Sequence, residues 1–299
     1  MKVYLGLPRG FCAGVVRAID VVELALKKFG PPVYVKHQIV HNPYVVRSLE
    51  DKGAITVEDV EEIPEGSRVV FSAHGSPPED FDKAKQRKLH VIDATCPLVT
   101  KVHNEARKYA KQGKKLVLVG HRGHQEVKGT MGVHSMHLVD DREPIQFPEW
   151  DSNTSIAVLT QTTLSVDDTQ HSIDEIKGRF TNVMVRNDLC YATTNRQAAV
   201  KELCKRVDLV LVIGAPNSSN CNRLREVAEA QGVPAFLING PEELKPAWLK
   251  GVDTVGITSG ASTPEQLVEA VIKALGPQEV VPIEGVEEDV TFVLPQELR

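Results

Sequence analysis

The sequence predicts an α/β protein of three small domains, each a parallel β-sheet flanked by helices, arranged about a pseudo-threefold axis around a central site. Two observations support this prediction. A pattern of strand, cysteine and amphipathic helix occurs three times along the 299 residues. The strand segments are also unbroken runs of Val, Ile and Leu, which is typical of parallel strands covered by helices on both faces.

Each repeat begins with a short strand that leads directly into a cysteine. These cysteines are Cys12, Cys96 and Cys190, and they lie 84 and 94 residues apart. Apolar residues at helical spacing follow each one: Ile19, Val22, Leu26 and Phe29; Val99, Val102, Ala106 and Tyr109; and Val200, Leu203 and Val207. We therefore expect each thiol at the N-terminus of a helix, where the helix dipole favours the thiolate, the form that binds metals.

Each repeat continues with two more strands that end in polar loops. The second-strand loops contain His41; then His124 and Glu126; then Ser218, Ser219 and Asn220. The third-strand loops contain His74; then Thr162 and Thr163; then Ser262. Helix-capping signals follow at Ser76, Ser165 and Thr263, with Pro77 and Pro264 expected at the first helical position. Because loops after the carboxyl ends of parallel strands lie at one edge of a sheet, we expect each thiol and its two polar loops to share that edge.

The repeats predict domains at residues 1–96, 97–190 and 191–299, with Cys12 inside the first and the other two thiols at domain edges. The acidic tail 277–299 contains one strand-like run, "VTFVLP". We expect this tail to pack back over a domain.

Composition and charge exclude several classes of protein. The net charge is −5, with acidic and basic residues interspersed, which argues against nucleic acid as a partner. No apolar run approaches the ~20 residues that span a bilayer, and the start "MKVYLGLPRGFCAG" lacks an apolar signal core. We therefore expect a cytoplasmic protein without a membrane partner. In that reducing compartment, the five widely spaced cysteines are not expected to form disulfides.

Three thiols at matching positions indicate a shared metal centre. Zinc with a fourth ligand such as histidine is one alternative, although the sequence has no C-x₂₋₄-C pair. The C-x₂-C-x₂-C run of ferredoxins is also absent. An iron–sulfur cluster held by three separate thiolates fits better and leaves one iron open to substrate. Cys204 is expected to pack within a helix, whereas Cys221, at a helix start, is an alternative fourth ligand.

Nine motifs in order resemble the 4-hydroxy-3-methylbut-2-enyl diphosphate reductase family, which acts last in the non-mevalonate isoprenoid pathway. They are "GFCAGVVRAI", "IVHNPYVV", "SAHGSPPE", "DATCPLVTKVH", "GHQEVKGTMG", "TQTTLSVDDT", "CYATTNRQ", "GAPNSSNCNRL" and "TSGASTPE", spanning residues 3 to about 275. The resemblance implies a three-domain trefoil around one [4Fe-4S] cluster per chain, held by Cys12, Cys96 and Cys190. It also implies removal of the allylic hydroxyl with two electrons and two protons, giving isopentenyl and dimethylallyl diphosphates.

The resemblance also implies roles for the loop residues. Glu126 would supply protons, and Thr162 would lie beside the substrate hydroxyl. The diphosphate would be bound by His41, His74, His124, Ser218, Ser219, Asn220 and Ser262. Two positions depart from the family pattern without removing a ligand: Gln125 stands where proline is common, and Val16 where a charged residue is frequent. Histidines without matching positions in the other repeats are expected to be structural or exposed: His37, His90, His103, His121, His134, His137 and His171.

The sequence also bears on the source of electrons and on two alternative functions. No G-x-G-x-x-G fingerprint of a nicotinamide or flavin site follows a strand, so an external one-electron donor such as ferredoxin or flavodoxin is expected. A lyase of the quinolinate synthase type is one alternative, but it would call for arginine clamps that these loops lack. A non-catalytic iron–sulfur redox sensor is the other, and Glu126 would then be dispensable.

Overall fold

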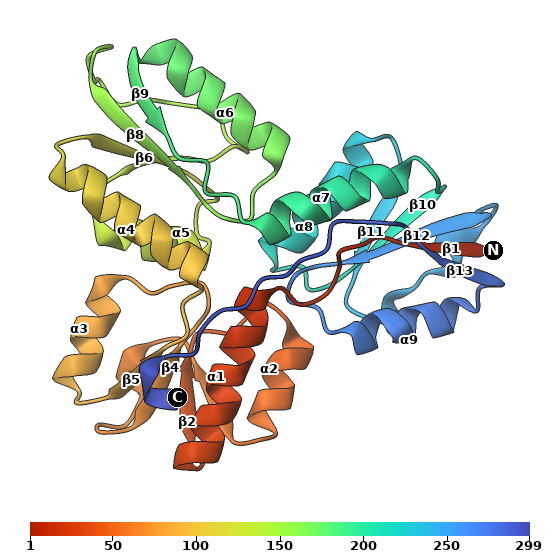
Figure 1. The fold of residues 1–299 in the computed structure, drawn as a ribbon, viewed down its shortest axis with the longest axis horizontal. Helices are drawn as coiled ribbons and strands as arrows, with labels where there is room; N and C mark the ends of the chain where they lie inside the picture. Colours follow the sequence, from red (N-terminus) through yellow and green to blue (C-terminus); the bar gives the residue numbers. More distant parts are fainter. The chain divides into compact units, whose positions relative to one another are not determined.

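The computed structural model describes residues 1–299 and contains three parallel β-sheets flanked by helices (Figure 1). The strand orders are β11-β10-β12-β1-β13, β3-β2-β4-β5 and β7-β6-β8-β9. The predicted α/β class, with three parallel sheets, is therefore confirmed. None of the helices combines the length and the apolarity needed to cross a bilayer.

The chain divides into two compact units. The first consists of Met1–Val15, His41–Val45 and Tyr191–Thr291, and the second of Val16–Val40, Val46–Cys190 and Phe292–Arg299. The five-stranded sheet lies in the first unit, and both four-stranded sheets lie in the second. The predicted arrangement of three domains about a threefold axis stays a prediction.

The sheet of the first unit is covered by helices on both faces. Its strands are β1 (Lys2–Leu5), β10 (Leu209–Ile213), β11 (Ala235–Ile238), β12 (Thr254–Ser259) and β13 (Glu279–Pro282). Its helices are α7 (Tyr191–Cys204), α8 (Ser219–Ala230) and α9 (Glu265–Leu275), with short 3₁₀ turns at Pro241–Glu243 and Pro246–Leu249. Val210 and Val212 of β10 pack against α7 and α8, whereas Leu211 packs in the opposite core with α9. This alternation within an all-apolar strand is what burial on both faces requires.

The second unit contains two smaller sheets. Their strands are β2 (Val33–Lys36), β3 (Ala54–Val57), β4 (Arg68–Phe71) and β5 (His90–Asp93); then β6 (Lys115–Val119), β7 (His137–Val139), β8 (Ser155–Thr160) and β9 (Asn182–Val185). The helices are α3 (Pro78–Gln86), α4 (Pro97–Lys111), α5 (Gln125–Val133) and α6 (Val166–Arg179), with a 3₁₀ turn at Val60–Glu62. Helices α1 (Ala13–Phe29) and α2 (Pro43–Glu50) begin in the first unit and continue in the second. The predicted apolar face of α4 is buried, as expected, against β6 and β8.

The strand that precedes each cysteine pairs with the third strand of a repeat. β5 pairs with β4, β9 pairs with β8, and β1 pairs with β12. Each cysteine strand therefore joins the sheet formed by the preceding repeat. For the first strand of the chain, the preceding repeat is the last one in the sequence.

This pairing reassigns β1, which the predicted boundary had placed with residues 1–96. The strand lies between β12 and β13, and its Val3 and Leu5 are buried in the same core as Ile257. A local apolar pattern predicts a strand but does not identify the partner strand, because the partner lies about 250 residues away. The other predicted domain boundaries stay predictions.

The C-terminal tail packs back on the protein, but through a different segment from the one predicted. Its strand is β13, which pairs with β1. The run "VTFVLP" at residues 290–295 forms no strand, and the side chain of Val293 is 68% exposed. The carbonyl of Val293 instead accepts a hydrogen bond from Arg17, so this carbonyl has a partner although no neighbouring strand is present.

One of the three predicted helix caps is confirmed. The Oγ atom of Ser165 accepts from the backbone N–H of Asp168 at 3.2 Å. The other two helices begin one residue later than predicted, with Pro77 and Pro264 as extended N-cap residues. Pro77 precedes Pro78, and a residue before proline is disfavoured in the helical region. Thr263 does not cap α9, because its hydroxyl donates to the carbonyl of Ile213 at 2.9 Å.

Candidate active site

The three repeated cysteines are held by equivalent backbone hydrogen bonds. The N–H group of each donates to the carbonyl of the residue two positions after the end of the neighbouring strand. These pairs are Cys12 with Ala261 at 3.2 Å, Cys96 with Ala73 at 3.0 Å, and Cys190 with Thr162 at 3.0 Å. The repeat predicted from the sequence is therefore present at the level of single hydrogen bonds. Convergence of the three sulfurs on one centre stays a prediction.

Each of these cysteines also stands directly before a helix, as predicted. Cys12 precedes α1, Cys96 is the N-cap of α4, and Cys190 precedes α7. All three side chains are partly exposed. The N-terminus of a helix stabilises negative ligands, and the thiolate is the form of cysteine that binds metal.

The remaining two cysteines lie in or against a hydrophobic core. Cys221 is fully buried, and this burial raises the pKa of its thiol. A Cβ atom built on Gly214 or Gly260 would lie only 2.3 or 2.1 Å from the sulfur. The alternative of Cys221 as a fourth ligand is therefore wrong, because its sulfur fills the core between two glycines. Cys204 packs against the same core, as predicted, and its burial raises the pKa of the thiol to about 11.

The position of the Cys221 sulfur predicts the effect of a single added methyl group. Gly260→Ala should lower the free energy of unfolding by about 1–3 kcal/mol, because the methyl overlaps the sulfur in a closely packed core. Chemical denaturation measures this change. Gly178→Ala is the matched control, since no atom lies within 4 Å of its added Cβ. Equal stabilities of Gly260→Ala and the wild type would contradict the placement of Cys221.

Glu126 and Thr162, both predicted site residues, lie together in the second unit. Oε1 of Glu126 accepts from the backbone N–H of Thr162 at 2.7 Å, and Oε2 accepts from the Thr162 hydroxyl at 2.9 Å. Burial raises the pKa of Glu126 to about 7, against the opposing effect of these hydrogen bonds. The carboxyl group can therefore carry a proton near neutral pH. Because the Thr162 carbonyl also accepts from the N–H of Cys190, Thr162 connects this carboxyl to a cysteine loop.

Two predicted histidines lie near each other in the same unit. His124 is the N-cap of α5, and its Nδ1 accepts from the N–H of Glu126 at 3.2 Å. A neutral imidazole that accepts through Nδ1 carries its proton on Nε2. The His74 ring lies 6.1 Å from that of His124, centroid to centroid, and its Nδ1 is 3.3 Å from the hydroxyl oxygen of Ser72. With Ser72 as the donor, the proton of each neutral ring lies on Nε2.

His41 and Ser262 lie together in the first unit. The hydroxyl of Ser262 donates to the backbone carbonyl of His41 at 3.1 Å, and the Asn217 amide is 3.5 Å from the Nδ1 of His41. Asn42, the next residue, accepts from two N–H groups in the first turn of α2. Ser262 can therefore donate to an anion only after its hydroxyl rotates away from His41.

The start of α8 has the clearest sign of a binding site. Ser218 is the N-cap residue, and Ser219 and Asn220 open the helix. The amide of Asn220 is buried, and neither its nitrogen nor its oxygen has a hydrogen-bond partner. A buried amide without partners is unfavourable and uncommon. An anion at this helix N-terminus would accept from the amide nitrogen and from the helix N–H groups.

The equivalent hydrogen bonds also distinguish Thr163, which the sequence placed in a polar loop without giving it a ligand role. Ala73, Thr162 and Ala261 correspond, so the next residues, His74, Thr163 and Ser262, correspond as well. Thr163 thus matches two of the predicted anion ligands. Because Thr162 and Thr163 are adjacent in the run "TQTT", the sequence alone does not indicate which of them is equivalent to His74 and Ser262.

Several histidines outside the predicted site have structural partners, as expected. His37 pairs with Glu58 at 2.7 Å, and His121 with Asp141 at 2.9 Å. His103 is buried beneath Gly75, and this burial lowers its pKa to about 4.

Comparisons with known proteins identify the family. Residues 3–276 match the family model described as LytB protein. The chain belongs to the LytB family.

Similar relatives and a similar solved structure are all named as diphosphate reductases. The 4-hydroxy-3-methylbut-2-enyl diphosphate reductase of Zymomonas mobilis subsp. mobilis is 51% identical over 306 residues, covering 100% of this chain and 90% of the relative. Reductase 2 of Bradyrhizobium diazoefficiens is 53% identical over 305 residues, covering 100% and 99%. The solved structure of the Plasmodium falciparum E-1-hydroxy-2-methyl-but-2-enyl-4-diphosphate reductase has a TM-score of 0.94 and 40% identity, covering 99% of this chain and 96% of that one. The relationship supports neither the lyase nor the redox-sensor alternative.

The family is iron–sulfur dependent, and the donor set of this chain fits such a group. Iron–sulfur clusters take cysteine thiolates as ligands. Three thiols are partly exposed at equivalent helix starts, whereas the other two pack in or against a core where burial raises their pKa.

Proposed function

We propose that this protein removes the allylic hydroxyl of 4-hydroxy-3-methylbut-2-enyl diphosphate, giving isopentenyl and dimethylallyl diphosphates in the last step of the non-mevalonate pathway. Family membership supports the substrate. The buried pair of Glu126 and Thr162 is the observation that carries the chemistry. Hydroxide is a poor leaving group, so the reaction needs a proton donor that is still protonated near neutral pH.

We further propose that Cys12, Cys96 and Cys190 hold one [4Fe-4S] cluster with one iron open to substrate. The three equivalent N–H to carbonyl bonds support this assignment, because they attach the backbone of each cysteine in the same way. When bound, the cluster supplies the two electrons, received singly from an external donor such as ferredoxin or flavodoxin.

The diphosphate is assigned to seven residues. They are His41, His74, His124, Ser218, Ser219, Asn220 and Ser262. The neighbouring rings of His74 and His124, and the helix starts of α5 and α8, support this assignment. Neutral donors of this kind can bind a multiply charged anion through hydrogen bonds alone. Thr163, equivalent to His74 and Ser262, is a further candidate.

The hydrogen bonds of Glu126 favour one of its oxygens as the proton carrier. Oε1 accepts from a backbone N–H, which cannot reverse its direction, so Oε2 is the oxygen that binds the proton. Oε2 faces the hydroxyl of Thr162 at 2.9 Å. When Glu126 is protonated, it donates to this hydroxyl, and the hydroxyl then donates to the substrate oxygen. Thr162 would thus pass the proton from a buried acid to the leaving group.

Replacing Asn220 separates ligand binding from stability. Asn220→Ala should weaken diphosphate binding by about 1.5–3 kcal/mol, and Ser218→Ala by a similar amount. Because the Asn220 amide has no protein partner, its removal should not lower the free energy of unfolding of the ligand-free protein. Anaerobic calorimetry with isopentenyl diphosphate measures the affinity.

Asn222→Ala is the control for this experiment, because its amide bonds the carbonyls of Pro216 and Ser218 and so orders the same loop. Unchanged affinity in Asn220→Ala would place the anion elsewhere. Equal losses in Asn220→Ala and Asn222→Ala would assign the effect to loop order.

Turnover tests the function directly. Protein purified without oxygen should contain iron and sulfide, and with a chemical reductant it should convert the hydroxylated allylic diphosphate to both isomeric products. An iron-loaded protein that leaves this substrate unchanged would refute the proposed reaction.

A further inference from the structure

A fully buried arginine connects the C-terminal segment, residues 286–299, to the loop of Cys12. Arg196 lies on α7 and has no exposed side-chain surface. Its Nη1 donates to both carboxylate oxygens of Glu288, at 2.9 and 3.2 Å. Its Nη2 donates to the carbonyl of Gly10 at 2.8 Å, two residues before Cys12. One guanidinium therefore bonds both the C-terminal segment and the backbone just before Cys12, a predicted metal ligand.

The other side of Cys12 is held by the same helix. The N–H of Ala13, the residue after Cys12, donates to the hydroxyl of Tyr191 at 3.1 Å. Tyr191 is the first residue of α7 and directly follows Cys190. The backbone is thus fixed by α7 both before and after Cys12.

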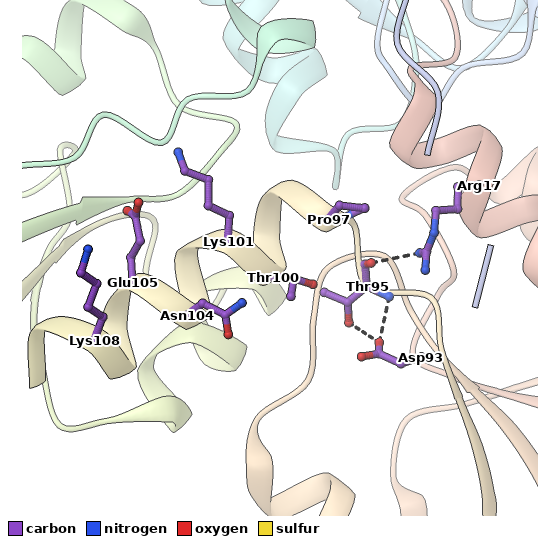
Figure 2. A pocket seen from close by; sticks show the side chains of 9 residues that line it. All are labelled: Arg17, Asp93, Thr95, Pro97, Thr100, Lys101, Asn104, Glu105 and Lys108. Atoms are coloured by element: carbon purple, nitrogen blue, oxygen red, sulfur yellow. Dashed lines mark hydrogen bonds between the residues drawn. The ribbon is translucent and has the colours of Figure 1, made fainter. Parts of the chain in front are cut away.

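A second arginine makes the corresponding connection in the second unit. Nη1 of Arg17 donates to the carbonyls of Ala94 and Thr95, at 3.2 and 3.1 Å, and its Nε donates to the carbonyl of Val293 at 2.8 Å. Thr95 directly precedes Cys96. Figure 2 shows Arg17 directed at Thr95, in a cavity of about 520 Å³ beside α4. Here too, one guanidinium joins the C-terminal segment to the backbone before a cysteine.

The Thr95 loop is fixed from its other side by Asp93. The carboxylate accepts from the N–H of Thr95 at 2.9 Å and from its hydroxyl at 2.5 Å (Figure 2). The N–H of Cys96 is bonded in turn to Ala73. Of the residues that hold the loop before Cys96, Arg17 also contacts the C-terminal segment.

Two features couple the C-terminal segment to the Cys12 loop: the burial of Arg196, and the absence of helix or strand in most of the segment. Residues 284–295 belong to no helix or strand, and the bonds of Arg196 to Glu288 and of Arg17 to Val293 help to hold them in place. A buried guanidinium needs its counter-ion, because an unpaired charge in the interior is strongly unfavourable. Without Glu288, Arg196 is expected to move toward water and to release the carbonyl of Gly10. Gly10 has a φ of +72°, so this loop depends on local bonds to keep an unusual backbone conformation.

We propose that the C-terminal segment clamps the loops of Cys12 and Cys96 through Arg196 and Arg17. Arg196, Glu288 and Arg17 are then positioning residues for the metal centre. This inference rests on the proposed function, because it takes these two loops as cluster ligands. Residues behind metal ligands orient them, and their loss makes the metal more labile.

The test measures iron release from the protein purified without oxygen. Glu288→Ala and Arg17→Gln should each lose iron to a ferrous chelator about 10-fold faster than the wild type. Their reduced forms should also give altered electron paramagnetic resonance spectra. Arg17→Lys keeps the positive charge and should recover part of the wild-type release rate.

Two variants serve as matched controls. Glu287→Ala removes the neighbouring carboxylate, which is exposed. Lys28→Gln removes a contact to the C-terminal segment, the bond to the Glu297 carbonyl at 2.7 Å, without touching a cysteine loop. This end of the chain lies beside α1 (Figure 1). Both controls should release iron at the wild-type rate.

The outcomes separate the clamp from the proposed function. Wild-type release rates and spectra in Glu288→Ala and Arg17→Gln would overturn the clamp, even if their melting temperatures fall. If Glu288→Ala does not fold, Glu288→Gln replaces it, because this variant keeps the side-chain volume and an acceptor oxygen but removes the charge that pairs with Arg196. Faster iron release in Glu288→Gln and Arg17→Gln would then support the clamp, and wild-type release in both would overturn it. A wild-type protein that holds no iron would instead overturn the proposed function, and the clamp with it.

Discussion

Glu126→Gln is expected to slow turnover by about 10²–10⁴-fold while leaving diphosphate affinity nearly unchanged. The glutamine has the same shape, and its amide oxygen can still accept from the backbone N–H of Thr162. It cannot supply a proton. Single-turnover measurements with a chemically reduced enzyme give the rate, and calorimetry gives the affinity. Near-normal turnover would remove the proton role of Glu126.

The pH dependence gives an independent test of the same residue. Since burial raises the pKa of Glu126 to about 7, its protonated fraction falls as the pH rises above that value. Turnover of the wild type should therefore decline above about pH 7, and Glu126→Gln should lack this decline. Glu143→Gln, which alters an exposed carboxylate paired with Arg122, should keep the wild-type profile. The same decline in Glu126→Gln would assign it to another group.

The raised pKa also has a consequence for stability. The folded protein binds this proton more tightly than the unfolded chain, whose carboxyl has an ordinary pKa of 4.5. The contribution of Glu126 to the free energy of unfolding is thus complete below about pH 4.5 and is lost as the pH rises to about 7. Urea unfolding of the wild type and of Glu126→Gln across this range measures the difference.

Cys96→Ser is expected to lose most of the bound iron, and turnover with it. An alcohol is far less acidic than a thiol and is a poor ligand for iron–sulfur clusters, so one of the three attachments is lost. Because Cys12 and Cys190 have equivalent hydrogen bonds, their serine variants should behave in the same way. Iron and sulfide analysis after anaerobic purification, with the absorption spectrum, measures the loss.

Cys204→Ser is the control for this prediction. Cys204 lies on α7 and packs against a core, so its replacement tests for a general loss of stability. It should keep the wild-type iron content. Unaltered iron in Cys96→Ser would remove the ligand assignment, and equal losses in both variants would show that the effect is not specific to the three repeated thiols.

The local patterns of the sequence were sufficient to determine much of the fold. Apolar runs predicted the strands, helical spacing predicted the buried face of α4, and Ser165 was recognised as a cap. The position of each cysteine between a strand and a helix also followed from neighbouring residues alone. These features depend on a few residues along the chain, which is why a single sequence contains them.

Other features were decided only by tertiary structure. The partner of β1 lies at the far end of the chain, Cys221 is buried between two glycines of separate loops, and Asn220 lacks a protein partner. The bonds of Arg196 to Gly10 and Glu288 likewise join three distant segments. Burial and hydrogen-bond partners are set by residues that meet only after folding. The sequence by itself therefore determined which residues stand in the loops, and the tertiary structure decided what each of them contacts.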